Sequence, residues 1–144
     1  MTTDLHIEVA ARLRMAGQRY TPRRRALVEA IAAADQPLNI VDILSQERGL
    51  AQSSVYRNLV VLEQARVVHR IVTGEDFARF ELAEDLSEHH HHLVCRSCGR
   101  VEDVSLPATL ERRMVGVLTE AASSAGFTPA AHRLDVIGTC RACG

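Results

Sequence analysis

Apolar positions in residues 1–64 recur at the three- to four-residue spacing that is typical of amphipathic helices. Four short helices are predicted. The first covers residues 4–15, and the second begins at Thr21-Pro22, a capping residue followed by proline at the first helical position. The third runs from Asn39 to Arg48, and the fourth starts after Gln52 or Ser53. Side chains of the second and fourth helices that we expect to face a core are Leu27, Val28, Ile31, Val55, Leu59, Val60 and Leu62.

The pattern changes to β-forming residues in segments 67–72 and 77–82, which turn residues 73–76 separate. This arrangement is typical of a β-hairpin. Helices followed by a hairpin predict a winged helix-turn-helix, a common DNA-binding layout. We therefore expect residues 1–82 to form a winged-helix DNA-binding domain.

The second part of the chain alternates between strands and a helix. Residues 83–88 are a polar, acidic connector and the expected hinge. Strands are predicted over 89–95, 100–104 and 132–137, and a helix over about 107–124. The predicted fold class is α+β, with a small C-terminal α/β dimerisation domain at 89–144. So short a segment is marginal for an independent core, which a metal and a second copy of the chain would supplement. The apolar face expected on the helix comprises Leu110, Met114, Val117, Leu118 and Ala121.

Composition narrows the class of protein. The chain has 144 residues, of which 47% are hydrophobic and 24% charged, so a folded chain is expected. No apolar run approaches the roughly 20 residues of a membrane span, and residues 1–15 resemble no signal peptide. A cytoplasmic protein is predicted, in which paired cysteines serve as metal ligands rather than disulfides. The net charge of −1 conceals +3 in residues 1–70 and −4 in 71–144, a weak indication that the first half meets a polyanion.

Two Cys-x-x-Cys pairs, Cys95/Cys98 and Cys140/Cys143, are separated by 41 intervening residues. Each pair can present two thiolates to one metal, and together they complete a tetrahedral shell. A structural zinc site is predicted, with two redox pairs or free buried thiols as the alternatives.

Four consecutive histidines, His89 to His92, lie just before the first cysteine pair. Because side chains alternate faces along a strand, His89 and His91 point one way and His90 and His92 the other. The run therefore predicts two further metal sites, whereas a purification tag would be terminal. Candidates for the remaining ligands are Glu111, His132, His69 and Glu81.

Together these motifs resemble the ferric uptake regulator family over nearly the whole chain. The matching residues are Arg19-x-Thr21-Pro22-Arg23, Ser54-Val55-Tyr56-Arg57-x-Leu59, His89 to Cys98, and His132 with Gly138-x-Cys140-x-x-Cys143. The resemblance implies a homodimeric, metal-dependent repressor with an N-terminal winged helix and a C-terminal dimerisation domain. Within the family, the histidine run is most similar to that of zinc uptake regulators.

The resemblance also implies site residues. One regulatory site, in the dimerisation domain, would use His89, His91, Glu111 and His132. A second, at the hinge, would use His69, Glu81, His90 and His92. Zinc regulators tend to have a cysteine just upstream of the histidine run, and residues 70–88 contain none. They also tend to have an aspartate where this chain has His69, so the hinge set is closer to the iron-regulator pattern.

The family's DNA contacts correspond to Arg19, Ser54, Tyr56 and Arg57. On the fourth helix, Tyr56 can pack against a thymine methyl group and Arg57 can reach a base edge or a phosphate. Arg19 could enter an A/T-rich minor groove.

The predicted function is metal-dependent repression of metal-uptake genes, with double-stranded operator DNA as partner and no membrane or small-molecule substrate. Zinc is the expected corepressor, and Fe²⁺, Mn²⁺ and Ni²⁺ tolerate the same ligands. Alternatives are a peroxide sensor of the same fold, a metal-buffering protein that binds no DNA and a zinc hydrolase with Glu111 as base. No His-Glu-x-x-His motif supports the hydrolase, so the protein is not expected to be an enzyme.

Overall fold

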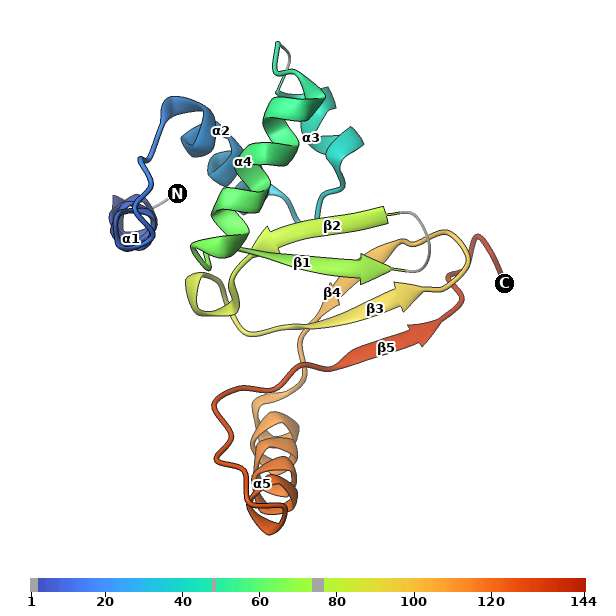
Figure 1. The fold of residues 1–144 in the computed structure, drawn as a ribbon. Helices are drawn as coiled ribbons and strands as arrows, with labels where there is room; N and C mark the ends of the chain where they lie inside the picture. Colours follow the sequence, from blue (N-terminus) through green and yellow to red (C-terminus); the bar gives the residue numbers. More distant parts are fainter. Residues whose placement is uncertain (1–2, 48, 74–76) are drawn as a thin grey trace.

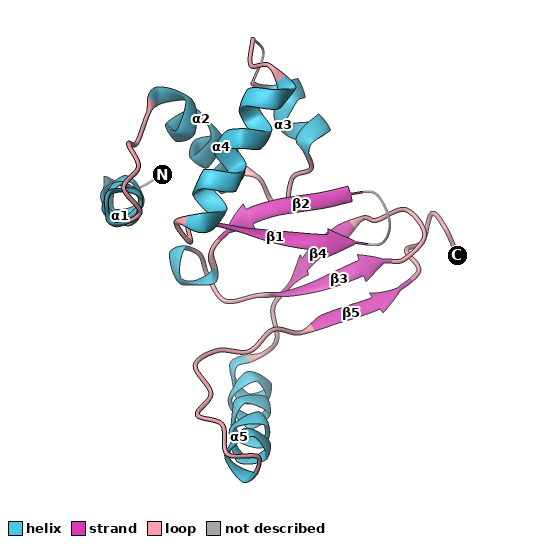
Figure 2. Ribbon diagram, viewed as in Figure 1, coloured by secondary structure: helices cyan, strands magenta, loops and turns pink. Residues whose placement is uncertain are grey.

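The computed structural model describes residues 3–47, 49–73 and 77–144. Helices come first, then a β-hairpin, then a second sheet with one long helix (Figures 1 and 2). The mixed helix and sheet architecture confirms the predicted α+β class. The elements in order are α1 (Thr3–Met15), α2 (Pro22–Ala33), α3 (Ile40–Gln46), α4 (Gln52–Gln64), β1 (Val68–Thr73), β2 (Phe77–Leu82), a 3₁₀ helix η1 (Glu84–Leu86), β3 (His91–Cys95), β4 (Val101–Val104), α5 (Ala108–Ser124) and β5 (Asp135–Gly138).

The first four helices pack together over the β1–β2 hairpin and bury one apolar core. The expected core positions are confirmed except Val60, which is only partly buried. Phe80 of β2 is fully buried at the centre of the hairpin, and its backbone pairs with Leu38 just before α3. Buried members of this core are Val9, Leu13, Leu27, Val28, Ile31, Leu38, Ile43, Val55, Leu59, Leu62, Ala65, Val67, Val68, Phe80 and Leu82.

Local capping chemistry explains where the helices begin. The Thr21 hydroxyl accepts a hydrogen bond from the Arg24 amide, and Pro22 occupies the first helical position, as predicted. Asn39 and Asp42 form a reciprocal capping box at α3. Helix α4 begins earlier than expected, at Gln52, after Ala51, which provides no side-chain cap. Two predicted features, the helix end at Arg48 and the centre of the turn at 74–76, lie outside the described residues.

The second sheet has the strand order β4–β3–β5 within the described residues. Strand β3 pairs antiparallel with β4 and parallel with β5, and α5 lies in the connection between β4 and β5 (Figure 1). Two predicted strands are shorter than expected: β3 starts at His91, and β5 starts at Asp135. His89, His90 and His132 therefore lie in segments that precede the strands.

Helix α5 differs most from expectation. None of residues 108–124 is buried, and Leu110, Val117 and Leu118 are 48%, 66% and 43% exposed. Figure 1 shows α5 below the three-stranded sheet, away from α1–α4, which we call the helical part of the molecule. The apolar face predicted from its periodicity is present, but this chain does not cover it.

The Arg79 side chain of β2 joins the two sheets. Its Nε donates to the Gly99 carbonyl at 2.9 Å, and its Nη1 lies 3.3 Å from the Pro37 carbonyl. Arg79 also lies 3.7 Å from Asp42 of α3. One guanidinium group thus connects the turn after β3 to the helical part of the chain. None of the helices in the described residues is both long enough and apolar enough to cross a membrane.

Replacing Phe80 by alanine should lower the free energy of unfolding by about 3–5 kcal/mol, because a fully buried aromatic ring leaves a cavity. Val72→Ala in the neighbouring strand is the control. Val72 is 73% exposed, so its truncation should change stability by only about 0.5 kcal/mol. Urea unfolding of the metal-loaded variants measures both. Equal stability of the two variants would contradict this view of the core.

Candidate functional site

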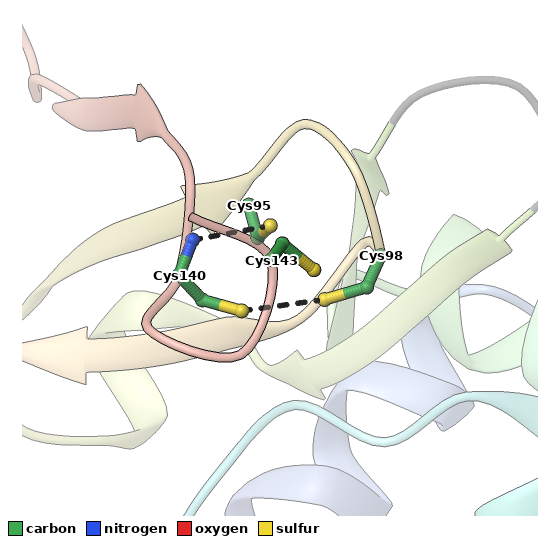
Figure 3. A group of neighbouring side chains, drawn as sticks. All are labelled: Cys95, Cys98, Cys140 and Cys143. Atoms are coloured by element: carbon green, nitrogen blue, oxygen red, sulfur yellow. Dashed lines mark hydrogen bonds between the residues drawn. The ribbon is translucent and has the colours of Figure 1, made fainter.

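The four cysteines meet at one end of the second sheet (Figure 3). Cys95 ends β3, and parallel pairing places it beside Gly138, so the chain after β5 brings Cys140 and Cys143 next to the first pair. All four sulfur atoms lie within 4.8 Å of one another. The Sγ atoms of Cys98 and Cys140 are 3.8 Å apart, which matches the edge of about 3.8 Å for a tetrahedron with zinc–sulfur distances of about 2.3 Å.

Backbone geometry supports this cluster. Gly99 follows the first pair with a φ of 73°, a conformation that favours glycine, and its amide donates to the Cys95 carbonyl at 2.9 Å. The amide of Cys140 donates to Cys95 Sγ at 3.3 Å. The amides of Cys140 and then Cys98 lower the pKa of Cys95 to about 6, which favours its thiolate.

The neighbouring thiols oppose ionisation of Cys143. Contact with the Cys140 sulfur, and then with Cys98, raises the pKa of Cys143 to about 12. A cluster of thiols resists full ionisation unless a cation compensates the accumulated negative charge. The donor set therefore fits a zinc ion, and four protein ligands leave no coordination position for a substrate.

A second group joins three histidines to one carboxylate. The Nε2 atoms of His89 and His132 lie 2.7 and 2.8 Å from Glu111 Oε1, and that of His91 lies 2.8 Å from Glu111 Oε2. Hydrogen bonds from His91, then His89 and His132, lower the pKa of Glu111 to about 2, although burial opposes the shift. His91 is 1% exposed whereas His89 is exposed, so the group extends from the interior to the surface. This is the set that the resemblance implies.

A third group gathers side chains from both parts of the chain. Glu81 Oε2, from β2, lies 2.8 Å from His90 Nε2 and 3.1 Å from His92 Nε2. The carboxylate of Asp103, on β4, lies 3.8 Å from His90 Nε2 and 3.7 Å from His92 Nε2. Burial raises the pKa of Glu81, but the hydrogen bonds from His92 and His90 outweigh it, so that the pKa is lowered. The group therefore favours an ionised carboxylate facing two imidazoles.

Asp103 was missed from the sequence, and His69 was expected in its place. Asp103 faces His92 directly in the β3–β4 pairing, a register that sequence alone does not reveal. His69 pairs with Glu81 across the β1–β2 hairpin and lines the same pocket, but it is not one of the four grouped side chains. Its Nε2 is buried without a hydrogen-bond partner among the described residues. Burial, followed by the charge of Arg133, lowers the pKa of His69, so this histidine favours its neutral form.

The predicted DNA contacts lie on the helical part. Tyr56 is 46% exposed on α4, and the Arg70 guanidinium lies 5.8 Å from its ring centre. Arg57 is exposed beside it, and Ser54 lies 3.4 Å from the Arg23 guanidinium. Arg19 is exposed before α2, and its carbonyl accepts from Arg24. These side chains face solvent around α2 and α4.

Comparison with known proteins identifies the class to which this fold and these sites belong. The profile described as "Ferric uptake regulator family" matches residues 15–137. The chain is similar to the "Peroxide operon regulator" of Bacillus subtilis (strain 168), with 28% identity over 140 residues, 94% of this chain and 91% of the relative. It also resembles the Vibrio cholerae ferric uptake regulator structure, with a TM-score of 0.68, 26% identity, and coverage of 89% and 96% of the two chains. The Helicobacter pylori ferric uptake regulator structure has a TM-score of 0.70, 24% identity, and coverage of 96% and 93%.

The chain therefore belongs to the ferric uptake regulator family, as its motifs predicted. It is a metal-responsive transcriptional regulator, and the members of this family are not enzymes.

Cys98→Ser should release the metal of the four-cysteine site, because one of its four thiolates is lost. Stability should fall by several kcal/mol, part of the roughly 10–16 kcal/mol that structural zinc contributes in zinc-finger peptides. Zinc content after dialysis and thermal unfolding measure the two effects. Ser97→Ala, at an exposed position in the same turn, should retain both zinc and stability. A Cys98→Ser protein that keeps its zinc and its melting temperature would contradict the structural role.

Proposed function

We propose that this chain is a homodimeric repressor of metal-uptake genes that binds operator DNA when its two histidine–carboxylate sites hold zinc. A third zinc, in the four-cysteine site, is structural. The observation that carries the proposal is that Glu81, His90, His92 and Asp103 converge from both parts of the chain.

The hinge group, which comprises Glu81, His90, His92 and Asp103, explains how metal binding can change the affinity for DNA. Glu81 belongs to the hairpin that supports the helical part, whereas His92 and Asp103 belong to the second sheet and His90 directly precedes it. A metal bound there supplies one attachment point for both parts. Glu81 is then held at a defined distance from β3 and β4, which restricts how far the hairpin can turn relative to the second sheet. The conformation with the four ligands together is thereby favoured over others.

Dimerisation converts this local restriction into DNA recognition. The exposed apolar face of α5, together with Val136 and Ile137 of β5, offers a surface for a second copy. In a symmetric dimer, the two α4 helices would reach half-sites about one helical turn apart only when both hinges adopt the matching angle. Tyr56 and Arg57 would then contact bases and phosphates, supported by Arg19 and Ser54 at the margin.

The donor sets favour zinc and admit other ions. Three imidazoles with one carboxylate, and two imidazoles with two carboxylates, suit Zn²⁺. Fe²⁺, Mn²⁺ and Ni²⁺ accept the same donors. The Helicobacter pylori structure is described as revealing "three functional metal binding sites", and three ligand groups occur in the described part of this chain.

A peroxide sensor is the second candidate. The Bacillus subtilis relative is named a peroxide operon regulator. In addition, the two carboxylates of the hinge group make it richer in oxygen donors than the site with Glu111, which suits Fe²⁺.

Operator binding titrated separately with Zn²⁺, Fe²⁺, Mn²⁺ and Ni²⁺ tests the proposal. Genomic fragments enriched by the metal-loaded dimer provide the DNA, and the protein is stripped of labile metal beforehand. Zinc should tighten binding about 10- to 100-fold, within the usual range of coupling between two sites. Arg57→Ala should weaken operator binding with the zinc response retained, whereas Arg113→Ala, exposed on α5, should behave like the parent.

DNA affinity that is indifferent to every metal would overturn the corepressor proposal. A response to iron alone that peroxide abolishes would identify the peroxide sensor instead.

A pair of variants tests the composition of the hinge site. Asp103→Ala removes a grouped carboxylate and should weaken metal-dependent operator binding by about tenfold or more. His69→Ala tests the ligand that the resemblance implies. If His69 only lines the pocket, its variant should respond to zinc like the parent, and an equal loss in both variants would make His69 a ligand as well. Both variants should retain the four-cysteine zinc.

A further inference from the structure

The 3₁₀ helix η1 carries two adjacent acidic residues that contact different parts of the molecule. The Glu84 carboxylate contacts His89 Nδ1, and Asp85 is bound by Arg12 of α1. His89 belongs to the group around Glu111, and Arg12 belongs to the helical part. We propose that Glu84 is a positioning residue for His89, and that η1 transmits the state of this site through Asp85 and Arg12 to α1 and the end of α4. The proposal rests on the metal role proposed above for the Glu111 group.

The first step concerns the two nitrogens of His89. Its Nε2 faces Glu111 together with the Nε2 atoms of His91 and His132, so Nε2 is the atom presented to a metal. Nδ1 is left to donate its proton to Glu84. A carboxylate on the outer nitrogen fixes the tautomer and the orientation of a metal-binding imidazole.

Glu84 differs from the outer partners of the hinge histidines. His90 Nδ1 lies 2.8 Å from the Glu88 carbonyl, and His92 Nδ1 lies 3.1 Å from the Asp135 carboxylate on β5. Those contacts stay within residues 88–144. Glu84, by contrast, lies in η1, directly before Asp85, which Arg12 of α1 binds. Glu84 therefore links the orientation of the His89 ring to the position of η1.

The second step follows from the residue next in the chain. Arg12 Nη1 and Nη2 donate to the two Asp85 carboxylate oxygens at 3.1 and 2.6 Å. This bidentate pairing raises the pKa of Arg12 and lowers that of Asp85 through their mutual hydrogen bonds. Both groups therefore remain charged near neutral pH.

Arg12 also contacts the chain at the C-terminal end of α4. Its Nη1 donates to the Arg66 carbonyl at 2.7 Å, just after α4. Arg66 has a φ of 60°, so the chain turns sharply there. Only 18% of the Arg12 side chain is exposed, which limits its freedom to leave these partners. One guanidinium group thus joins α1, the C-terminal end of α4 and η1.

The two steps form a continuous path from Glu111 through His89, Glu84, Asp85 and Arg12 to Arg66. Coordination of His89 through Nε2 withdraws electron density from the ring and makes Nδ1–H a stronger donor. Occupancy should therefore tighten the Glu84 contact and hold η1 in place. By reciprocity, a chain with η1 held should bind the metal more tightly.

Cobalt binding and hydrogen exchange test the proposal without DNA. The full-length chain carries Glu81→Ala to weaken the hinge site, and Co²⁺ serves as a spectroscopic probe. In this background, Glu84→Ala should weaken cobalt binding about 10- to 100-fold, the usual effect of losing an outer partner. Glu84→Gln should recover part of the affinity, because its amide oxygen still accepts from Nδ1–H. Glu88→Ala, which removes an acidic side chain from the same segment and keeps the carbonyl, is the matched control and should bind like the background chain.

Amide hydrogen exchange then tests the path from His89 to Arg66. Cobalt should increase amide protection in residues 84–86, in α1 and around Arg66, and this increase should be lost in Glu84→Ala. Arg12→Gln should keep the cobalt site at a moderately lower affinity, as reciprocity requires, and confine the added protection to residues 84–92. Glu111→Ala should lose the cobalt site altogether.

Two results would overturn the proposal: cobalt affinity in Glu84→Ala equal to that of the background chain, or an unchanged rise in α1 protection in that variant. Failure of the proposed function gives a different result. Operator affinity would then be the same with and without metal, while the effects of Glu84→Ala on cobalt affinity and on amide protection would persist.

Discussion

The pairing of β3 with a strand on each side is the constraint on which all three ligand groups depend. This short strand carries His91, His92 and Cys95, and the residues just before it carry His89 and His90. Parallel pairing with β5 brings the second cysteine pair beside the first. Antiparallel pairing with β4 places Asp103 opposite His92. A shift of one residue in either register would move these side chains to the opposite face and separate the ligands.

Hydrogen bonds between carboxylates and imidazoles stabilise the buried polar side chains of the ligand groups. His91 and His92 are almost fully buried, which is costly for imidazoles unless they find hydrogen-bond partners. Glu111 and Glu81 each face histidines, and the histidines in turn keep the pKa of both carboxyl groups below the usual range. Apart from His91 Nδ1, which has no hydrogen-bond partner among the described residues, these side chains satisfy one another. The same groups can bind a cation, so the stability of this region and its capacity for metal are linked.

Different interactions stabilise the helical part and residues 89–144. The helical part buries a continuous apolar core around Phe80 and Leu59. The second part leaves its α5 and β5 side chains largely exposed, and its buried positions in residues 89–144 are Val101, Cys95, Gly99 and two histidines. Ligand clusters and a second copy of the chain are the natural replacements for a core of this size. Under the proposed function, metal would serve both the structure of this second part and its response.

The sequence by itself determined much of the architecture, because its signals are local. Caps at Thr21 and Asn39, helical periodicity and the hairpin pattern each depend on residues a few positions apart, and the structure confirms them. The Cys-x-x-Cys spacing and the histidine run likewise revealed most ligand candidates, because alternation along a chain is a local property.

Only the tertiary structure decided which distant residues complete each group. Asp103 joins the hinge group through strand register, and Glu84 and Asp85 contact His89 and Arg12 through the path of the chain around η1. The exposure of α5 also escaped prediction, because periodicity shows that a helix has an apolar face but not what covers it. Register, chain path and packing partner arise between segments far apart in sequence, and no local pattern encodes them.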